Sequence, residues 1–241
     1  MYTIACCNTD PGLVRSHNED TCLANNEDGY FLVADGMGGA AAGEVASALF
    51  KKATVGLFSS DPERTPDEAQ ELVMECFQSA NRKILSHVNE VPSHSGMGCT
   101  AELLVFHNDG FILGHVGDSR TYSWSRGRLK QLTKDHTFVQ EQLDQDLISK
   151  EQAKTHSMRN LILRVVGSND GLKVDIIHDN VLVGDILLLC TDGLSSMVED
   201  VQVKEILAIE EPLAVKGTML IDQANNAGGK DNIAVVLIEI I

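Results

Sequence analysis

The sequence predicts an α+β fold built mainly from antiparallel strands. β-prone runs are joined directly by short turns, such as NDG at 108–110 and RGR at 126–128, which is typical of hairpins rather than of repeating βαβ units. Two pairs of helical segments separate the groups of strands. The 241 residues, 43% of them hydrophobic, suffice for one sizeable core. No Pro-, Ser- or Gly-rich linker divides the chain, so we expect a single domain over residues 1–241.

The first third of the chain is expected to hold three strands and then two helices. Strand signals lie at 2–7, 21–26 and 30–35. A helix is predicted from about 43 to 58, and a second from about 66 to 91, which has Pro66 in its first turn. The second helix has one apolar face, formed by Leu72, Val73, Cys76, Phe77, Ala80, Ile84 and Val88.

The remainder of the chain returns to strands and closes with helices. Residues 137–160 are polar and rich in Gln and Glu, and we interpret them as a mobile surface subdomain. Two helices are expected at about 200–209 and 212–226. The strands are expected at 99–107, 111–118, 121–125, 129–133, 172–178, 185–192 and 233–241.

The charge balance limits the kinds of partner. Thirty-five acidic residues against 19 basic ones give a net charge of −16, which argues against nucleic-acid binding through phosphate neutralisation. The densest basic cluster, RGRLK at 126–130, has the pattern of a hairpin tip. A solvated acidic surface would explain the excess charge, and so would carboxylates gathered around cations.

The cysteines and the N-terminus indicate a compartment. Six cysteines occur without a C-x-x-C pair, and several lie in apolar runs, which is typical of buried, reduced thiols in a cytoplasmic protein. The N-terminal MYTIACCNTD lacks the basic flank and the apolar length of a signal peptide. No apolar run approaches the ~18 residues of a membrane span, so we expect no membrane association.

A glycine-rich stretch raises a nucleotide-binding alternative. Residues 36–41, GMGGAA, follow a strand and satisfy the pattern G-x-G-x-x-A. A dinucleotide fold also requires a βαβ unit with an acidic residue about 20 positions further on, at the end of the next strand. Position 56 instead falls within a helix, and another helix follows before any strand. The context therefore disfavours a nucleotide loop.

Carboxylates recur where the expected strands begin and end. Asp35, Asp118 and Asp192 lie at strand exits, and Asp20 and Asp231 lie at strand entries. In an antiparallel sheet the exit of one strand lies beside the entry of its neighbour, so we expect all five to converge on one edge. A single Asp-Gly is usually only a turn. Five gathered carboxylates, in contrast, require cations, and oxygen ligands suit Mg²⁺ or Mn²⁺.

Such a site would suit phosphate chemistry. Two bound divalent ions can lower the pKa of a bridging water and hold a phosphoryl group for in-line attack. The small Gly36 leaves its carbonyl free to approach an ion. Arg15, five positions before Asp20, is the candidate for gripping the phosphate oxygens.

These residues together resemble the metal-dependent serine/threonine protein phosphatase family (PPM, type 2C), in its bacterial branch. Seven short motifs appear in order from Thr9 to the C-terminus, each weak alone and together strongly specific. They are R-S-H-N-E-D at 15–20, D-G-M-G-G at 35–39, G-C-T-A at 98–101, G-H-V-G-D-S-R at 114–120, L-T-K-D-H-T at 132–137, T-D-G at 191–193 and G-G-K-D-N at 228–232.

The resemblance implies a β-sandwich of two antiparallel sheets flanked by helices, with two Mn²⁺ or Mg²⁺ ions at one end and a third, weaker ion. It implies hydrolysis of phosphoserine and phosphothreonine by a water that bridges the metals. Residues 137–160 correspond to the family's flap beside the active site. The implied roles are a metal bridge for Asp35, the first metal for Asp192 and Asp231, the second metal for the carbonyl of Gly36, contact through water for Asp20 and Glu19, phosphate binding for Arg15, and the third metal for Asp118 with Asp192.

Two positions depart from the family pattern. Animal members carry a histidine where this chain has Met37, and some bacterial members carry one where it has Ala40. That histidine is the usual candidate for protonating the leaving alkoxide, so the general-acid role has no side chain assigned to it here. Metal-bound water is the remaining candidate for that work.

Competing functions find less support. The segment 76–82 has the C-x5-R spacing of cysteine-dependent phosphatases, but Cys76 lies mid-helix on the apolar face, where core packing is expected. A catalytically inactive phosphoprotein-binding module would have lost a metal ligand, and Asp35, Asp192 and Asp231 are all present. We therefore expect an active, monomeric enzyme that acts on the phosphorylated substrates of a Ser/Thr protein kinase.

Overall fold

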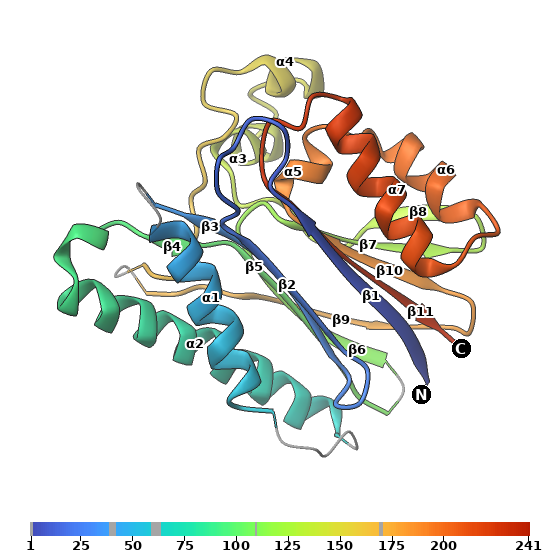
Figure 1. The fold of residues 1–241 in the computed structure, drawn as a ribbon, viewed down its shortest axis with the longest axis horizontal. Coiled ribbons are helices and arrows are strands. Elements are labelled where there is room, and N and C mark those ends of the chain that lie inside the picture. The colour runs from blue at the N-terminus through green and yellow to red at the C-terminus, as the bar shows by residue number, and fades with distance from the viewer. Residues whose placement is uncertain (1, 39–41, 59–63, 109, 169–170) are drawn as a thin grey trace.

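The computed structural model describes residues 2–38, 42–58, 64–108, 110–168 and 171–241. Its strands form two antiparallel sheets that lie face to face (Figure 1). The first sheet has the order β1 (Thr3–Asp10), β11 (Ile233–Ile240), β10 (Ile186–Cys190), β7 (Arg120–Ser125) and β8 (Arg128–Gln131). The second has the order β2 (Asp20–Asn25), β3 (Tyr30–Met37), β5 (Ala101–Phe106), β6 (Gly110–Val116) and β9 (Asp175–Asn180), and the short β4 (Gly98–Cys99) pairs with the end of β3.

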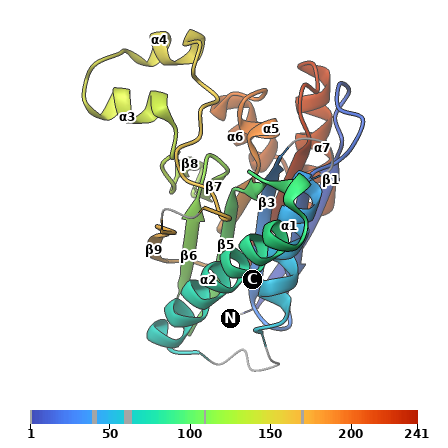
Figure 2. The same ribbon diagram turned by 90° about the vertical axis from the view of Figure 1, so that its left-hand side faces the viewer.

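Helices cover the outer faces of the sandwich. Helices α1 (Ala42–Val55) and α2 (Pro66–Glu90) pack on the sheet of β2 and β3, and a 3₁₀ turn at Pro92–His94 follows α2. Helices α6 (Asp200–Ala208) and α7 (Leu213–Asn226) lie on the other sheet, next to the single turn α5 (Asp192–Ser195). Helices α3 (Phe138–Asp144) and α4 (Lys150–Thr155) stand beyond the end of the sandwich (Figure 2). The α+β sandwich prediction is confirmed.

The alternation of side chains along the strands builds three apolar layers. On β3, Tyr30 and Leu32 face α1 and α2, whereas Phe31 and Val33 face the other sheet. On β10, Leu188 packs against α6 and α7, and Leu187 contributes to the layer between the sheets. Successive residues of a strand point to opposite faces, so each buried strand serves two layers at once. The sequences of these buried strands are therefore continuous apolar runs, without alternation of apolar and polar residues.

The long helix α2 illustrates how local signals fix an element. Thr65 and Glu68 form a capping box, with Glu68 Oε2 accepting from the Thr65 backbone N–H at 2.9 Å, and Pro66 occupies the first turn. Cys76 is fully buried on the face that packs on the sheet, and Arg82 pairs with the exposed Glu75 at 2.6 Å. The interpretation of the C-x5-R segment as core packing is confirmed.

The structure also settles the nucleotide alternative. Strand β3 is followed by two helices, and the next strands, β4 and β5, pair with it antiparallel. A βαβ unit is thus absent around the described part of the glycine-rich stretch, whose residues 39–41 lie outside the described residues.

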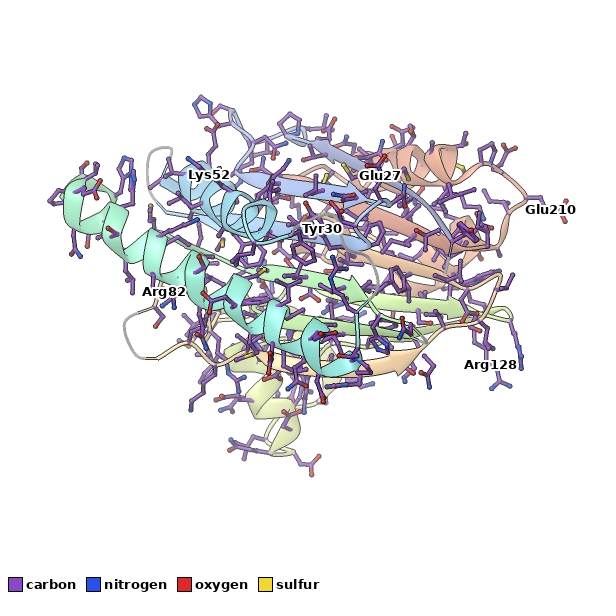
Figure 3. The ribbon with its side chains drawn as sticks, turned by 90° about the horizontal axis from the view of Figure 1, so that it is seen from below. Glu27, Tyr30, Lys52, Arg82, Arg128 and Glu210 are labelled. Carbon is purple, nitrogen blue, oxygen red and sulfur yellow. The ribbon has the colours of Figure 1, made fainter. Side chains whose placement is uncertain are left out.

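The basic cluster at 126–130 forms the predicted hairpin tip between β7 and β8, and Arg128 projects from it (Figure 3). None of the described helices combines the length and apolar character needed to cross a bilayer.

Candidate metal centre

The five predicted carboxylates come together at one end of the sandwich. Asp20 and Asp35 are directly opposite one another in the β2–β3 pair. Asp192 begins α5 just after β10, and Asp231 precedes β11, the strand that pairs with β10. Asp118 follows β6 and precedes β7. The expectation that they would share one sheet edge was incomplete, because they come from both sheets and meet where the two sheets end together.

Asp35 lies at the centre of this group. Burial raises the pKa of Asp35 well above its ordinary value, and the carboxylates of Asp20, Asp192, Asp118 and Asp231 raise it further. The carboxyl groups of Asp20 and Asp192 both lie against that of Asp35. Acids gathered this closely retain a proton unless a cation compensates their charge. A cation would replace that proton and relieve the repulsion.

The pKa values of the surrounding carboxylates are raised as well. Burial, followed by the charges of Asp192 and Asp231, raises the pKa of Asp20 to about 7, against a hydrogen bond from Thr191 that lowers it. Burial and the charge of Asp231 raise the pKa of Asp192 to about 6. Each shift has the sign expected when acids are gathered without a compensating charge. The group is therefore arranged to receive positive charge.

The side chain of Asp118 has an oxygen atom that is placed to bind a cation. Its side chain is buried, and Oδ1 has no hydrogen-bond partner among the described residues. Burial and the charge of Asp192 raise the pKa of Asp118 to about 8. A buried carboxylate oxygen without a donor is unfavourable by roughly 1–3 kcal/mol or more. Asp118 Oδ1 is thus placed as a cation ligand would be.

The spacing of the acids indicates which kind of ion they suit. In the described ranges, no three His, Cys, Asp or Glu side chains are close enough to hold an ion by themselves. Structural zinc sites need three or four such ligands, whereas Mg²⁺ keeps several waters and binds through one or two carboxylates. The residues present fit a hydrated ion held by a few oxygen atoms.

Gly36 is required by the close approach of two elements. A Cβ atom on Gly36 would overlap the backbone carbonyl of Gly43 in α1 and come within 2.6 Å of the carbonyl oxygen of Glu19. A Cβ atom on Gly43 would in turn lie 2.5 Å from the Gly36 carbonyl oxygen and 2.8 Å from the Glu19 carboxyl carbon. The two glycines therefore leave the Gly36 carbonyl and the Glu19 carboxylate next to one another. Burial raises the pKa of Glu19.

Arg15 reaches the acidic group from the loop between β1 and β2. Its Nη2 donates to Asp231 Oδ2 at 2.8 Å, and its side chain is 53% exposed. This hydrogen bond, together with the charge of Asp231, raises the pKa of Arg15. The guanidinium is therefore at the mouth of the site, with much of its surface facing solvent.

Sequence reasoning missed Asn232 as a positioning residue. Its side chain is almost fully buried, and Oδ1 accepts from the Glu19 backbone N–H at 2.8 Å. Its Nδ2 donates to the carbonyls of Pro11 and His17 at 2.9 and 2.8 Å. Asn232 thus fastens both ends of the segment that carries Arg15. The motif G-G-K-D-N contained the signal, because an amide beside a ligand can donate and accept at once.

Two threonine hydroxyl groups bind residues of the acidic group, Thr191 at the Asp20 carboxylate and Thr100 at the Asp35 backbone. Thr191 Oγ1 donates to Asp20 Oδ2 at 2.7 Å and accepts from the Ala234 backbone N–H at 2.9 Å. Thr100 Oγ1 accepts from the Asp35 backbone N–H at 3.1 Å and lies 2.7 Å from Ser119 Oγ. Both belong to motifs noted in the sequence, T-D-G and G-C-T-A, where their hydroxyl groups were not assigned a role.

A buried polar network supports the loop that carries Asp118. Glu102 and His115 are fully buried and ion-paired, and Glu102 Oε2 accepts from Thr121 Oγ1 at 2.7 Å. The pKa of His115 is raised, because the Glu102 carboxylate outweighs its burial. Burial lowers the pKa of His136 to about 4, so its neutral Nδ1 accepts from the Gly117 backbone N–H at 3.1 Å. The network anchors both sides of the turn at 117–118.

Met37 ends β3 opposite Gly98, and Ala40, the second position without a histidine, lies outside the described residues.

Comparisons with known proteins agree with this geometry. The family model described as Protein phosphatase 2C matches residues 14–214. The serine/threonine phosphatase stp of Listeria monocytogenes is 36% identical over 242 residues, which cover 96% of this chain and 93% of that protein. The crystal structure of the Mycobacterium tuberculosis serine/threonine phosphatase PstP/Ppp is 37% identical, with a TM-score of 0.92 over 100% of this chain and 99% of that one.

A further solved structure holds metal. The catalytic domain of the serine/threonine protein phosphatase PstP in complex with 2 manganese ions is 36% identical, with a TM-score of 0.89 over 99% of this chain and 98% of that one. The resemblance inferred from the seven motifs is confirmed by the family match, the sequence relatives and the solved structures together. This chain belongs to the protein phosphatase 2C family.

Proposed function

We propose that this protein is a metal-dependent phosphatase that hydrolyses phosphoserine and phosphothreonine in proteins. The observation that carries the proposal is the meeting of five carboxylates from two sheets, with Asp35 at their centre, where burial and the charges of the other four raise its pKa. Family membership and the serine/threonine phosphatase names of the relatives support the reaction, and the two manganese ions of the PstP structure support a binuclear centre. Mg²⁺ suits the same oxygen ligands.

The ligand roles that we propose follow the positions of the side chains. Asp35, buried at the centre of the acidic group, is the bridging ligand. The remaining roles are Asp192 and Asp231 at the first ion, the Gly36 carbonyl at the second, Asp20 and Glu19 through water, and Asp118 with Asp192 at a third, weaker ion. The orphaned Oδ1 atom supports the role of Asp118.

The chain's own residues supply binding and orientation. When bound, the ions polarise a water molecule and neutralise charge on the phosphoryl oxygens. Arg15 turns from Asp231 to grip two phosphate oxygens, for which its half-exposed, planar guanidinium is suited. Asn232 keeps Arg15 in reach, and Thr191 keeps Asp20 facing Asp35. Met37 offers no proton, so we propose that water held by the metals would protonate the leaving alkoxide.

Metal dependence and one ligand substitution test the function. We expect Mn²⁺-dependent hydrolysis of a phosphothreonine peptide that EDTA abolishes. Asp192→Ala should remove activity while the circular dichroism spectrum is retained, and Asp222→Ala, at an exposed position on α7, should leave activity unchanged. Activity that survives EDTA, or that is lost in Cys76→Ser with the fold intact, would refute the mechanism. Full activity of Asp192→Ala would refute the ligand assignment.

We propose the remaining context on separate grounds. Residues 1–241 form one catalytic domain, with the segment 137–160 as a flap, supported by the placement of α3 and α4 beyond the sandwich (Figure 2). The six free cysteines favour a cytoplasmic location. The substrates are phosphoproteins made by a Ser/Thr protein kinase, and the enzyme acts as a monomer. Size-exclusion chromatography with light scattering tests the last statement, and a dimer would contradict it.

A further inference from the structure

Two thiols from different sheets meet at the open edge of the sandwich. Cys7 lies on β1 and Cys22 on β2, the edge strands of the two sheets, which run side by side (Figure 1). Cys6 Sγ donates to the Leu213 carbonyl at 3.4 Å on the α7 side. Side chains alternate along a strand, so Cys7 points the opposite way, towards the other sheet. There the Cys7 and Cys22 side chains lie against one another.

The surroundings of the pair make one thiol reactive and hold the other beside it. Cys7 is exposed, whereas Cys22 is buried in the layer between the sheets. The hydrogen bond from Cys22 and the ammonium group of Lys51 lower the pKa of Cys7 to about 6, although burial of part of the side chain opposes them. Lys51 is fixed there by its hydrogen bond to the Cys22 carbonyl at 3.0 Å. The contact with Cys22 and the charge of Lys51 therefore favour the reactive thiolate form of Cys7.

The other cysteines provide an internal contrast. All six cysteines lie within the described ranges. Burial raises the pKa of Cys6, and it raises those of Cys76, Cys99 and Cys190 as well. An exposed thiolate in contact with a second thiol is the arrangement that reacts selectively with oxidants. Cys7 is the cysteine of this chain that meets both conditions.

We propose that Cys7 and Cys22 form a peroxide-reactive pair, in which Cys7 is oxidised by a hydroperoxide and then joined to Cys22 as a disulfide. The Cys7 thiolate attacks one oxygen of hydrogen peroxide, the O–O bond breaks, and the departing hydroxide takes up a proton to become water. Cys7 is then a sulfenic acid. Cys22 sulfur bonds to Cys7 sulfur while the sulfenic hydroxyl leaves with the Cys22 proton as a second water. Two thiols lose two electrons, and the peroxide gains them.

The disulfide would change the connectivity of the molecule. It would join the two sheets at an edge where β1 and β2 have no common ladder, since each pairs with a different strand. It would also close the chain between positions 7 and 22 into a covalent loop, and that loop contains Arg15. Closing a loop restricts the unfolded chain, so the oxidised protein should unfold at a higher temperature than the reduced one.

Peptide mapping tests the proposal on the full chain. Fully reduced protein is treated with hydrogen peroxide, free thiols are blocked, and trypsin digestion is carried out without reductant. We expect the peptides 1–15 and 16–51 to appear linked, lighter by two hydrogen atoms than their sum, with two of the six thiols lost and both recovered with dithiothreitol. An unlinked pair of peptides, at a peroxide concentration that oxidises other thiols of the chain, would overturn the proposal.

Two adjacent substitutions identify the reacting thiol, because Cys6 and Cys7 lie in the same tryptic peptide. Cys6→Ser should keep the link and Cys7→Ser should abolish it, and the opposite result would overturn the assignment. In Cys22→Ser, dimedone should trap a sulfenic acid on Cys7 and leave Cys6 unmodified. If Cys22→Ser fails to fold by circular dichroism, Cys22→Ala replaces it. The link in Cys6→Ser requires neither Cys22 variant and tests the pair independently.

Discussion

Substitution of Asn232 by alanine should loosen the loop that carries Arg15 without removing the side chain of any proposed metal ligand. The variant removes three hydrogen bonds of 2.8, 2.9 and 2.8 Å, to the backbone of Glu19, Pro11 and His17. At about 0.5–1.5 kcal/mol each, they contribute roughly 1.5–4.5 kcal/mol to stability. Water can reach part of this loop, so we expect a loss of about 2 kcal/mol in the free energy of unfolding.

The same free energy sets the expected effect on catalysis. If the ordering that Asn232 provides is what places Arg15, a loss of about 2 kcal/mol lowers kcat/KM roughly 30-fold. Urea unfolding measures the first effect, and hydrolysis of a phosphothreonine peptide with Mn²⁺ measures the second. Asn26→Ala is the matched control, because its exposed Oδ1 accepts a single hydrogen bond, from Thr3 at 3.1 Å. Unchanged stability together with unchanged kcat/KM in Asn232→Ala would refute the positioning role.

Three further predictions concern the buried charges and the close glycine contact. The pKa of Asp118 is raised from 3.8 to about 8, so the stability that its proton contributes is present below about pH 4 and is lost as the pH rises through 8. In EDTA-treated protein, stabilisation by added Mn²⁺ should therefore grow between pH 5 and 8 in thermal unfolding, and a flat response would contradict this. Gly36→Ala, whose Cβ would overlap α1, should lower both melting temperature and activity; wild-type values would contradict the clash. Glu102→Ala should destabilise the protein by about 3–5 kcal/mol in urea, because it leaves His115 buried without its partner. Glu75→Ala breaks only an exposed pair and should change stability by less than about 1 kcal/mol, and equal losses in the two variants would contradict the role of burial.

Local pattern and strand order were enough to predict much of the site. Asp20 and Asp35 had to be neighbours, because the two strands that hold them are joined by a short turn and pair antiparallel. Asp192 and Asp231 lie at the ends of β10 and β11, which also pair antiparallel, but three helices separate these two strands in the sequence. Only the first pairing is a hairpin that alternation and turn residues reveal. The family motifs then indicated that the pairs belong to one site.

The site residues that the sequence did not predict make contacts between segments that are far apart in the sequence. Thr191 reaches Asp20 across 171 positions, and Asn232 reaches Glu19 across 213 positions. No periodicity predicts such a hydrogen bond, because the partners meet only after the two sheets have packed. The four-residue helix α5 is too short to leave a helical pattern, so the strand predicted over 185–192 ends at Cys190 instead. Sequence patterns describe the elements, and packing of the sheets decides which side chains face each other.

Because the acidic residues belong to both sheets, the apolar layer between the sheets determines how far apart the two sets of carboxylates lie. Phe31 and Val33 pack in this layer and position the strand that carries Asp35, and Leu189 does the same for the strand that leads to Asp192. A change of volume in that layer would shift one half of the ligand set against the other. Metal affinity would then depend on side-chain packing in the core, and substitutions in this layer would change the affinity without altering any ligand.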